Sequence, residues 1–155
     1  MFKTQTRVSV SITERLRDME DFCARWKGTV FAFCKMLLGD EGAAEAVTLE
    51  TFLVYLREGE FRKSETGFPF RLFSLALSAT EKYPSGSPQI PEGPSQLERA
   101  LRGLPRLERA VVIMRNLLHF DWERLAQAIG VPQTEAHELW KHGLFHLNDL
   151  LQRDS

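Results

Sequence analysis

The sequence predicts an all-α fold made of two small helical domains, and three observations support this prediction. Apolar residues recur every three or four positions along most of the chain, which is the period of a helix with one buried face. Residues with helix-capping chemistry precede several of these segments. The stretch "YPSGSPQIPEGPS", from Tyr83 to Ser95, is rich in Pro, Gly and Ser, as linkers are. We therefore expect one domain over residues 1–83, a linker over 84–95 and a second domain over 96–155.

The first helix is predicted from a capping pair and one apolar stripe. Ser11 and Glu14 have the spacing of a capping box, which predicts that the helix starts at Ser11. The stripe follows at helical spacing and consists of Phe22, Trp26, Val30, Phe33 and Leu37. Gly39 is expected to end this helix, and Asp40 can cap the next one.

Two further helices complete the first domain. The second is expected over Glu41–Arg57, where apolar residues again recur at helical spacing. The loop "EGEFRKSETG" follows it. Pro69 then suits the first turn of a third helix, "PFRLFSLALSATEK", because its fixed φ angle matches the helix and its missing N–H is not needed there.

The second domain is predicted to contain four helices. Ser95 and Glu98 form another capping box, and Pro105 suits the start of the segment "PRLERAVVIMRNLL". Asp121 is expected to cap the short helix "WERLAQAI", which Gly130 ends. "VP" then leads into the last helix.

The last two of these helices have the pattern of a helix-turn-helix. Such a motif needs a small residue where the first helix meets the second, and a Gly four residues later that permits a left-handed turn. Ala126 and Gly130 have this spacing. Ala136 and Leu139 fall where the second helix packs back on the first.

Composition and charge exclude several classes of protein. The net charge is -1, so no general basic excess attracts nucleic acid. No apolar run approaches the roughly 20 residues that span a bilayer, and the first residues lack the apolar centre of a signal peptide. We therefore expect a cytoplasmic protein without membrane contact.

Cys23 and Cys34 would lie about 16 Å apart on one helix, too far for a disulfide, and are expected to be buried free thiols.

Catalytic and cofactor chemistry is not predicted. Ser74, Ser78 and Thr80 have no evident base beside them, and the glycines of "PSGSP" and "PEGPS" belong to the linker. No constellation of acid, base and nucleophile is assembled in the sequence. The chain is thus expected not to be an enzyme and to need no cofactor.

Two segments of the sequence resemble the extracytoplasmic-function sigma factors of RNA polymerase. "ALRGLPRLERAVVIMRNLLHFDWERLAQAIGV", Ala100 to Val131, aligns without a gap with the fourth sigma domain, including its "LP..ER.V" segment and its "LA...GV" turn. "LLGDEGAAEAVTLETFLVYLR" and "PFRLFSLALSATEK" resemble two consecutive helices of the second sigma domain. The resemblance covers about Phe22 to Leu151. It implies a domain-two-like unit followed by a helix-turn-helix unit like domain four.

The resemblance implies binding to core RNA polymerase and to promoter DNA. The DNA-reading positions of the last helix would be Gln133, Thr134, His137, Glu138 and Lys141. The polymerase-binding face would contain Glu45, Ala46, Leu49 and Glu50. Both sets depart from the family pattern. Ala46 and Leu49 replace an Asp and a Gln, and the Arg-rich last helix is replaced by "TEAHELWKHGLFHL".

The last helix has few of the cations that bind phosphate. Between Gln133 and Asn148, Lys141 is the only Lys or Arg, whereas Glu135 and Glu138 carry negative charge. Four arginines earlier in the domain recur at helical spacing and are candidate phosphate contacts: Arg99, Arg102, Arg106 and Arg109. The alternative interpretation is a solvated helix face, which such spacing more often indicates.

The histidines of the last helix also have two interpretations. His142 and His146 stand one turn apart and Glu138 stands one turn earlier, which is the spacing of a metal-binding face. An exposed helix that happens to carry His explains the same spacing, and we predict no metal site. Protonation of the imidazoles at low pH would return positive charge to this face.

Two hypotheses about function follow. The first is a sigma-like initiation factor that binds core RNA polymerase and promoter DNA. The second is a sigma-fold protein that binds a protein partner and no longer reads promoters. That partner would be an anti-sigma factor, which the protein titrates, or a second copy of this chain. The overall family pattern favours the first hypothesis, whereas the lost cations and the altered polymerase face favour the second. From the sequence we predict the first function, with the second as the alternative.

Overall fold

The computed structural model describes residues 2–58, 67–83 and 95–153, with side chains described from Ile12 onward. Within these ranges every regular element is a helix, which confirms the predicted all-α class. The elements are α1 (Phe2–Leu38), α2 (Glu41–Glu58), α3 (Phe70–Ala79), the 3-10 turn η2 (Thr80–Lys82), α4 (Gln96–Arg102), α5 (Arg106–Val112), the π-helical turn η3 (Ile113–Leu117), α6 (Trp122–Ile129) and α7 (Gln133–Arg153). Residues 84–94 of the predicted linker and 59–66 of the predicted loop lie outside the described residues.

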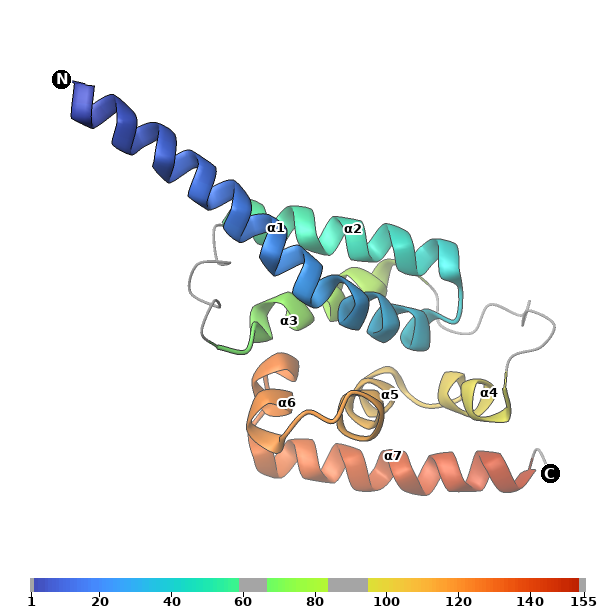
Figure 1. Ribbon diagram of the computed structural model, residues 1–155. Helices are drawn as coiled ribbons and strands as arrows, with labels where there is room; N and C mark the ends of the chain where they lie inside the picture. The colour runs from blue at the N-terminus through green and yellow to red at the C-terminus, as the bar shows by residue number, and fades with distance from the viewer. Residues whose placement is uncertain (1, 59–66, 84–94, 154–155) are drawn as a thin grey trace.

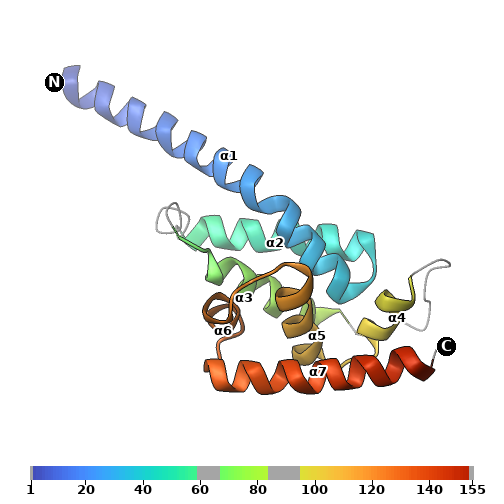
Figure 2. The same cartoon turned by 60° about the horizontal axis from the view of Figure 1, so that its bottom comes forward.

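The first helix is longer than the sequence predicts. α1 begins at Phe2 instead of Ser11 and runs for 37 residues, and its first half extends beyond the rest of the protein (Figures 1 and 2). Residues 2–11 contain neither Pro nor Gly, so nothing in the sequence breaks the helix before Ser11. A capping pair marks the start of a helix only where the preceding residues are not themselves helical. The second half of α1 packs against α2 and α3.

The predicted boundaries of the next two helices are close to the observed ones. The Asp40 carboxylate caps α2 by accepting from the Ala43 N–H at 2.9 Å. Pro69 is the residue before α3 and is not itself helical. Aromatic rings join the three helices. Phe22 of α1 stacks on Tyr55 of α2 with ring centroids 5.1 Å apart, and Trp26 meets Phe73 of α3 edge-on at 5.9 Å.

Two predicted caps are confirmed in the second half of the chain. Ser95 Oγ accepts from the Glu98 N–H at 3.1 Å, and Asp121 Oδ1 accepts from the Arg124 N–H at 2.8 Å. Pro105 directly precedes α5, as expected. α7 then runs along α4, α5 and α6 and closes this half of the molecule (Figure 1).

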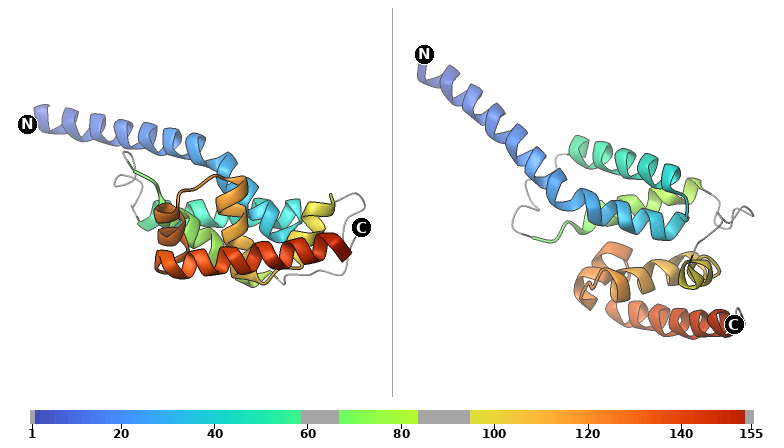
Figure 3. Two further views of the ribbon diagram at one scale, coloured as in Figure 1. Left: turned by 90° about the horizontal axis from the view of Figure 1, so that it is seen from below. Right: turned by 45° about the vertical axis from the view of Figure 1, so that its right-hand side comes forward.

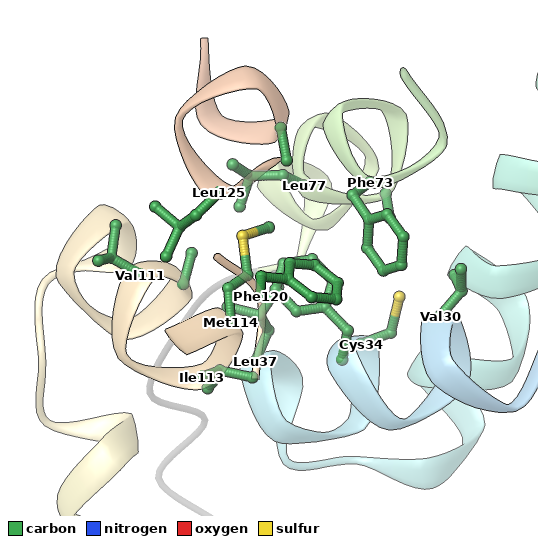
Figure 4. Packing of buried hydrophobic residues seen from close by; sticks show 14 of the residues in the cluster. Val30, Cys34, Leu37, Phe73, Leu77, Val111, Ile113, Met114, Phe120 and Leu125 are labelled. Carbon is green, nitrogen blue, oxygen red and sulfur yellow. The ribbon is translucent and has the colours of Figure 1, made fainter. Parts of the chain in front are cut away.

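The two halves share one hydrophobic core. α1, α2 and α3 form one layer and α4 to α7 form a second layer beside it (Figures 1 and 3). Phe120, which precedes α6, is buried against Phe68 and Phe73, with ring centroids 4.8 Å and 5.0 Å apart. Figure 4 shows Met114 and Leu77, from opposite layers, in the same cluster. Because the described halves pack together, the division of the chain into two domains, 1–83 and 96–155, remains a proposal.

The two cysteines differ in burial. Both are free, and Cys34 is fully buried, as predicted, whereas Cys23 is only half-buried. Cys23 lies beside an open groove between α1 and α2, so the expectation that both thiols are buried is wrong for this residue.

None of the described helices combines the length and apolar character that crossing a membrane requires.

Candidate recognition helix and partner surface

The helix-turn-helix geometry predicted from the sequence is present in α6 and α7. Gly130 ends α6 in the left-handed conformation, with φ 84° and ψ 31°. The Ala126 carbonyl accepts from the Gly130 N–H at 2.8 Å and from the Val131 N–H at 3.2 Å. Ala126 and Ala136 are buried where the two helices meet, and Leu139 is half-buried beside them. The turn thus joins α6 to α7 as a helix-turn-helix requires.

The leading turns of α7 expose little free positive charge. Four of the five predicted DNA-reading residues are exposed: Gln133, Thr134, Glu138 and Lys141. Lys141 Nζ lies 3.4 Å from the Glu138 carboxylate one turn earlier, so this exposed cation stands beside a negative charge. The fifth residue, His137, is half-buried, and its ring stacks on Trp122 with centroids 3.7 Å apart. His137 is therefore a packing residue in this structure.

A cluster around Trp122 was not anticipated from the sequence. Trp140 meets Trp122 edge-on at 5.3 Å and donates from Nε1 to Asn116 Oδ1 at 2.8 Å. The Arg115 guanidinium lies over the Trp122 ring, 4.5 Å from its centroid. These contacts bind α7 to η3 and α6, and they occupy the Arg115 cation close to the first turns of α7. The signal in the sequence is only that the last helix carries apolar residues, Trp140 among them, on more than one face.

The candidate metal face of α7 is not assembled. His146 turns to α5, where its Nδ1 lies 2.7 Å from Glu108 Oε2, and Glu108 is buried. His142 remains exposed. In the part of the chain that the structure describes, three His, Cys, Asp or Glu side chains do not converge as metal ligands would.

The predicted phosphate-binding arginines point mainly into the protein. Arg109 is only 3% exposed and donates to three carbonyl oxygens, those of Leu37 at 2.6 Å, Arg102 at 2.7 Å and Leu104 at 3.0 Å. Burial first, and the charges of Arg102 and Arg106 second, lower the pKa of Arg109 from its ordinary value. The solvated-face interpretation is therefore wrong for Arg109, whereas its contact with a DNA phosphate stays a prediction.

Two of the remaining arginines also bind the opposite layer. Arg102 donates to the carbonyl of Gly39 at 3.0 Å, and Arg106 donates to the carbonyl of Leu77 and pairs with Glu81 at 3.2 Å. These carbonyls lie at the C-terminal ends of α1 and α3, where helices leave acceptors unpaired and favour cations. Arg99 alone of the four is exposed. The four arginines stand on two helices, because Gly103–Pro105 separates α4 from α5, and the other half of the chain accepts hydrogen bonds from three of them.

The predicted polymerase-binding face lies on the outer side of α2. Glu45 and Ala46 are exposed, and Leu49 is 63% exposed. Glu50 is half-buried and forms an ion pair with Lys82, so it holds α2 to η2. Leu53, one turn after Leu49, is 54% exposed and extends the apolar surface.

A groove of about 610 Å³ runs beside this face, between α1 and α2. Its lining is mostly apolar and is formed by Cys23, Lys27, Phe31, Glu41, Glu45, Thr48, Leu49 and Phe52. We call this groove, together with Leu53, the α1–α2 surface. Two carboxylates and one ammonium group form its charged rim. Exposed leucines beside a hollow are unusual on a surface without a partner.

The comparisons with known proteins concern the fold. No protein-family model matches the sequence, and no curated protein matches it significantly. Among solved structures, the chain is similar to the sigma factor RpoE in its complex with the anti-sigma factor NepR from Bartonella quintana. The TM-score is 0.72 and the sequence identity is 16%, over 90% of this chain and 99% of that chain. The fold of this protein is thus that of a sigma factor.

Proposed function

We propose that this chain is a sigma-fold protein that acts in the cytoplasm by binding another protein through the α1–α2 surface, and that it does not read promoters. The observation that carries the proposal is the contrast between its two candidate interfaces. The α1–α2 surface presents apolar side chains to solvent beside a groove, whereas the exposed face of α7 presents a cation that is already paired.

The chemistry of the α1–α2 surface fits an amphipathic helix. Leu49 and Leu53 stand one turn apart on α2, and a helix that lies in the groove would cover both of them. Glu41 and Glu45 at the rim favour basic residues on the polar side of that helix. Replacement of the polar family residues by Ala46 and Leu49 makes this face more apolar. An anti-sigma factor is the class of partner that we propose, supported by the complex in which the structural neighbour was solved.

The electrostatics of the second half argue against DNA binding. Phosphate neutralisation by Lys and Arg supplies most of the non-specific affinity for DNA. Arg102, Arg106 and Arg109 bind carbonyls at the contact between the halves, and Arg115 covers the Trp122 ring. These cations would have to leave their partners before they could contact a duplex.

Site-specific photo-crosslinking in the source cells tests this proposal. A benzophenone side chain at position 49 is expected to crosslink to one protein, and a control at position 97, where Leu97 on α4 is 38% exposed, is not. The crosslinked protein is then purified and titrated against the chain. Leu49→Asp should weaken its binding at least tenfold, because a carboxylate replaces a desolvated leucine, whereas Leu97→Asp should leave binding unchanged. Equal crosslinking at the two positions would refute the assignment of this surface.

The runner-up function is that of an initiation factor that binds core RNA polymerase and promoter DNA. The observation in its favour is the intact turn between α6 and α7, which still orients a recognition helix. Co-elution of the chain with purified core RNA polymerase tests it. Stable co-elution that Leu49→Asp abolishes would favour initiation, whereas separate elution, together with a crosslinked regulatory protein, favours the first proposal.

A further inference from the structure

A small cavity lies where the end of α1, the turn η2 and α5 meet. Its volume is about 240 Å³, and its lining comes from both halves of the chain. Leu37, Leu38 and Tyr83 provide its less polar walls. Arg106 and Arg109 line it from α5, and Glu81 stands on the η2 side with its side chain 65% exposed. The cavity is distinct from the α1–α2 surface and from the exposed face of α7.

The cavity is bordered by buried positive charge that the described contacts compensate only in part. The three hydrogen-bond partners of Arg109 are backbone carbonyls, which carry no net charge. The Nε atoms of both Arg106 and Arg109 are buried without a hydrogen-bond partner among the described residues. Glu81 pairs with Arg106, but this carboxylate is mostly exposed to water. The two guanidinium groups that line the hollow therefore each contain one donor that neither water nor a described group satisfies.

Such an arrangement of guanidinium groups favours the binding of an anion in the cavity. Buried cations are stabilised in proteins by an anionic partner at hydrogen-bond distance, and a guanidinium matches the oxygen atoms of phosphate especially well. The lowered pKa of Arg109, which burial and its neighbouring arginines cause, agrees with a missing counter-charge. The carboxylate of Glu81 would compete with the anion for Arg106 because both bear negative charge.

We propose that this cavity binds a small oxyanion of the phosphate type, held by the guanidinium groups of Arg106 and Arg109. Binding requires both halves to be in place, since Leu37 and Leu38 come from α1 whereas the arginines come from α5. The anion thus favours the arrangement in which the two layers are packed together. Its two sources are free inorganic phosphate and the phosphate group of a phosphorylated small molecule.

Thermal unfolding in phosphate, compared with chloride at equal ionic strength, tests the proposal. A ligand at 100 times its Kd is expected to raise the Tm of a chain this size by about 5–10 °C. The rise must saturate. Glu81→Gln should saturate at a several-fold lower phosphate concentration, because a competing carboxylate is removed. The matched control, Glu123→Gln at an exposed position of α6, should behave like the unmodified chain.

Two further measurements complete the test. If the chain binds glycerol phosphate more tightly than inorganic phosphate, the ligand of the cavity is a phosphorylated small molecule. If it binds glycerol phosphate more weakly, the ligand is the free anion. In nitrogen-15 spectra of the unmodified chain, the Nε–H signals of Arg106 and Arg109 should shift with phosphate, so the test does not depend on any variant folding. A Tm rise without saturation that is identical in all variants is the general effect of excluded salts and would overturn the site. Unshifted Nε–H signals would do so as well.

Discussion

Removal of the Phe120 ring should unfold both halves of the chain together. Phe120 is 7% exposed and contacts Phe68 and Phe73, which belong to the other layer. If these contacts join the halves into one cooperative unit, Phe120→Ala lowers the stability of the whole chain and not only of the segment that carries the residue. The substitution leaves a cavity that the surrounding helices can fill only in part.

The magnitude follows from buried Phe→Ala substitutions in general, which cost about 3–5 kcal/mol. This is a large part of the roughly 5–15 kcal/mol that stabilises an ordinary domain. Since 1 kcal/mol shifts the Tm by about 2–4 °C at this size, the Tm should fall by about 6–20 °C. Trp26 reports on the first layer and Trp122 on the second, so tryptophan variants that keep one or the other follow each half separately.

The assay is urea unfolding followed by fluorescence and circular dichroism. Phe145→Ala provides the matched control, because Phe145 is 73% exposed on α7 and its loss should change stability by no more than about 0.5 kcal/mol. A single transition that shifts to lower urea for both halves confirms the reasoning. A loss below 1 kcal/mol, or a shift confined to the second half, would show that the shared core is wrongly described.

Three further changes test individual contacts. Gly130→Ala should cost about 1–2 kcal/mol in urea unfolding, since Gly130 has φ 84° and an L-residue there is strained; an unchanged midpoint would contradict the left-handed turn. Gly143→Ala places a Cβ 2.8 Å from Val112 Cγ2, so overpacking of about 1–3 kcal/mol should outweigh a gain of about 1 kcal/mol in helix propensity. In a Val112→Ala background that cost should become smaller, because only the contacts with Glu108 at 3.3 Å and 3.4 Å remain, and an unchanged cost would locate the clash elsewhere. Burial raises the pKa of Cys34 to about 11 from an ordinary value of 9.0. The unfolded thiol therefore ionises first, and stability should fall by about 2 kcal/mol between pH 9 and pH 11. Cys34→Ala should remove that part of the pH dependence, and an identical pH profile would refute it.

Local signals in the sequence predicted the turns and caps well. Asp40, Ser95 and Asp121 cap the helices as expected, because a cap is made by groups within three residues of one another. Gly130 was equally accessible to prediction, since only its own backbone conformation decides the turn. Ser11 is the exception. Its capping chemistry is present, but the preceding residues continue the helix.

The sites could be predicted only in part, because burial depends on distant segments. The spacing of Arg102, Arg106 and Arg109 shows neither that a helix ends between the first two nor that their partners are carbonyls at the ends of α1 and α3. In the same way, nothing near His137 in the sequence indicates that Trp122 will stack on its ring. Leu49 is exposed on α2, and its contact with a partner remains a proposal.

Fluorescence anisotropy of labelled DNA tests most directly whether this sigma-fold protein has lost promoter binding. The probes are a mixed-sequence duplex and a forked DNA, each titrated at low and at physiological salt. Ordinary non-specific binders saturate with Kd values of about 1–100 µM at physiological salt, and more tightly at low salt. We predict no saturable binding in this range at either salt concentration. Saturable, salt-dependent binding that Lys141→Gln weakens would contradict the proposed absence of DNA binding. It would favour the function of an initiation factor.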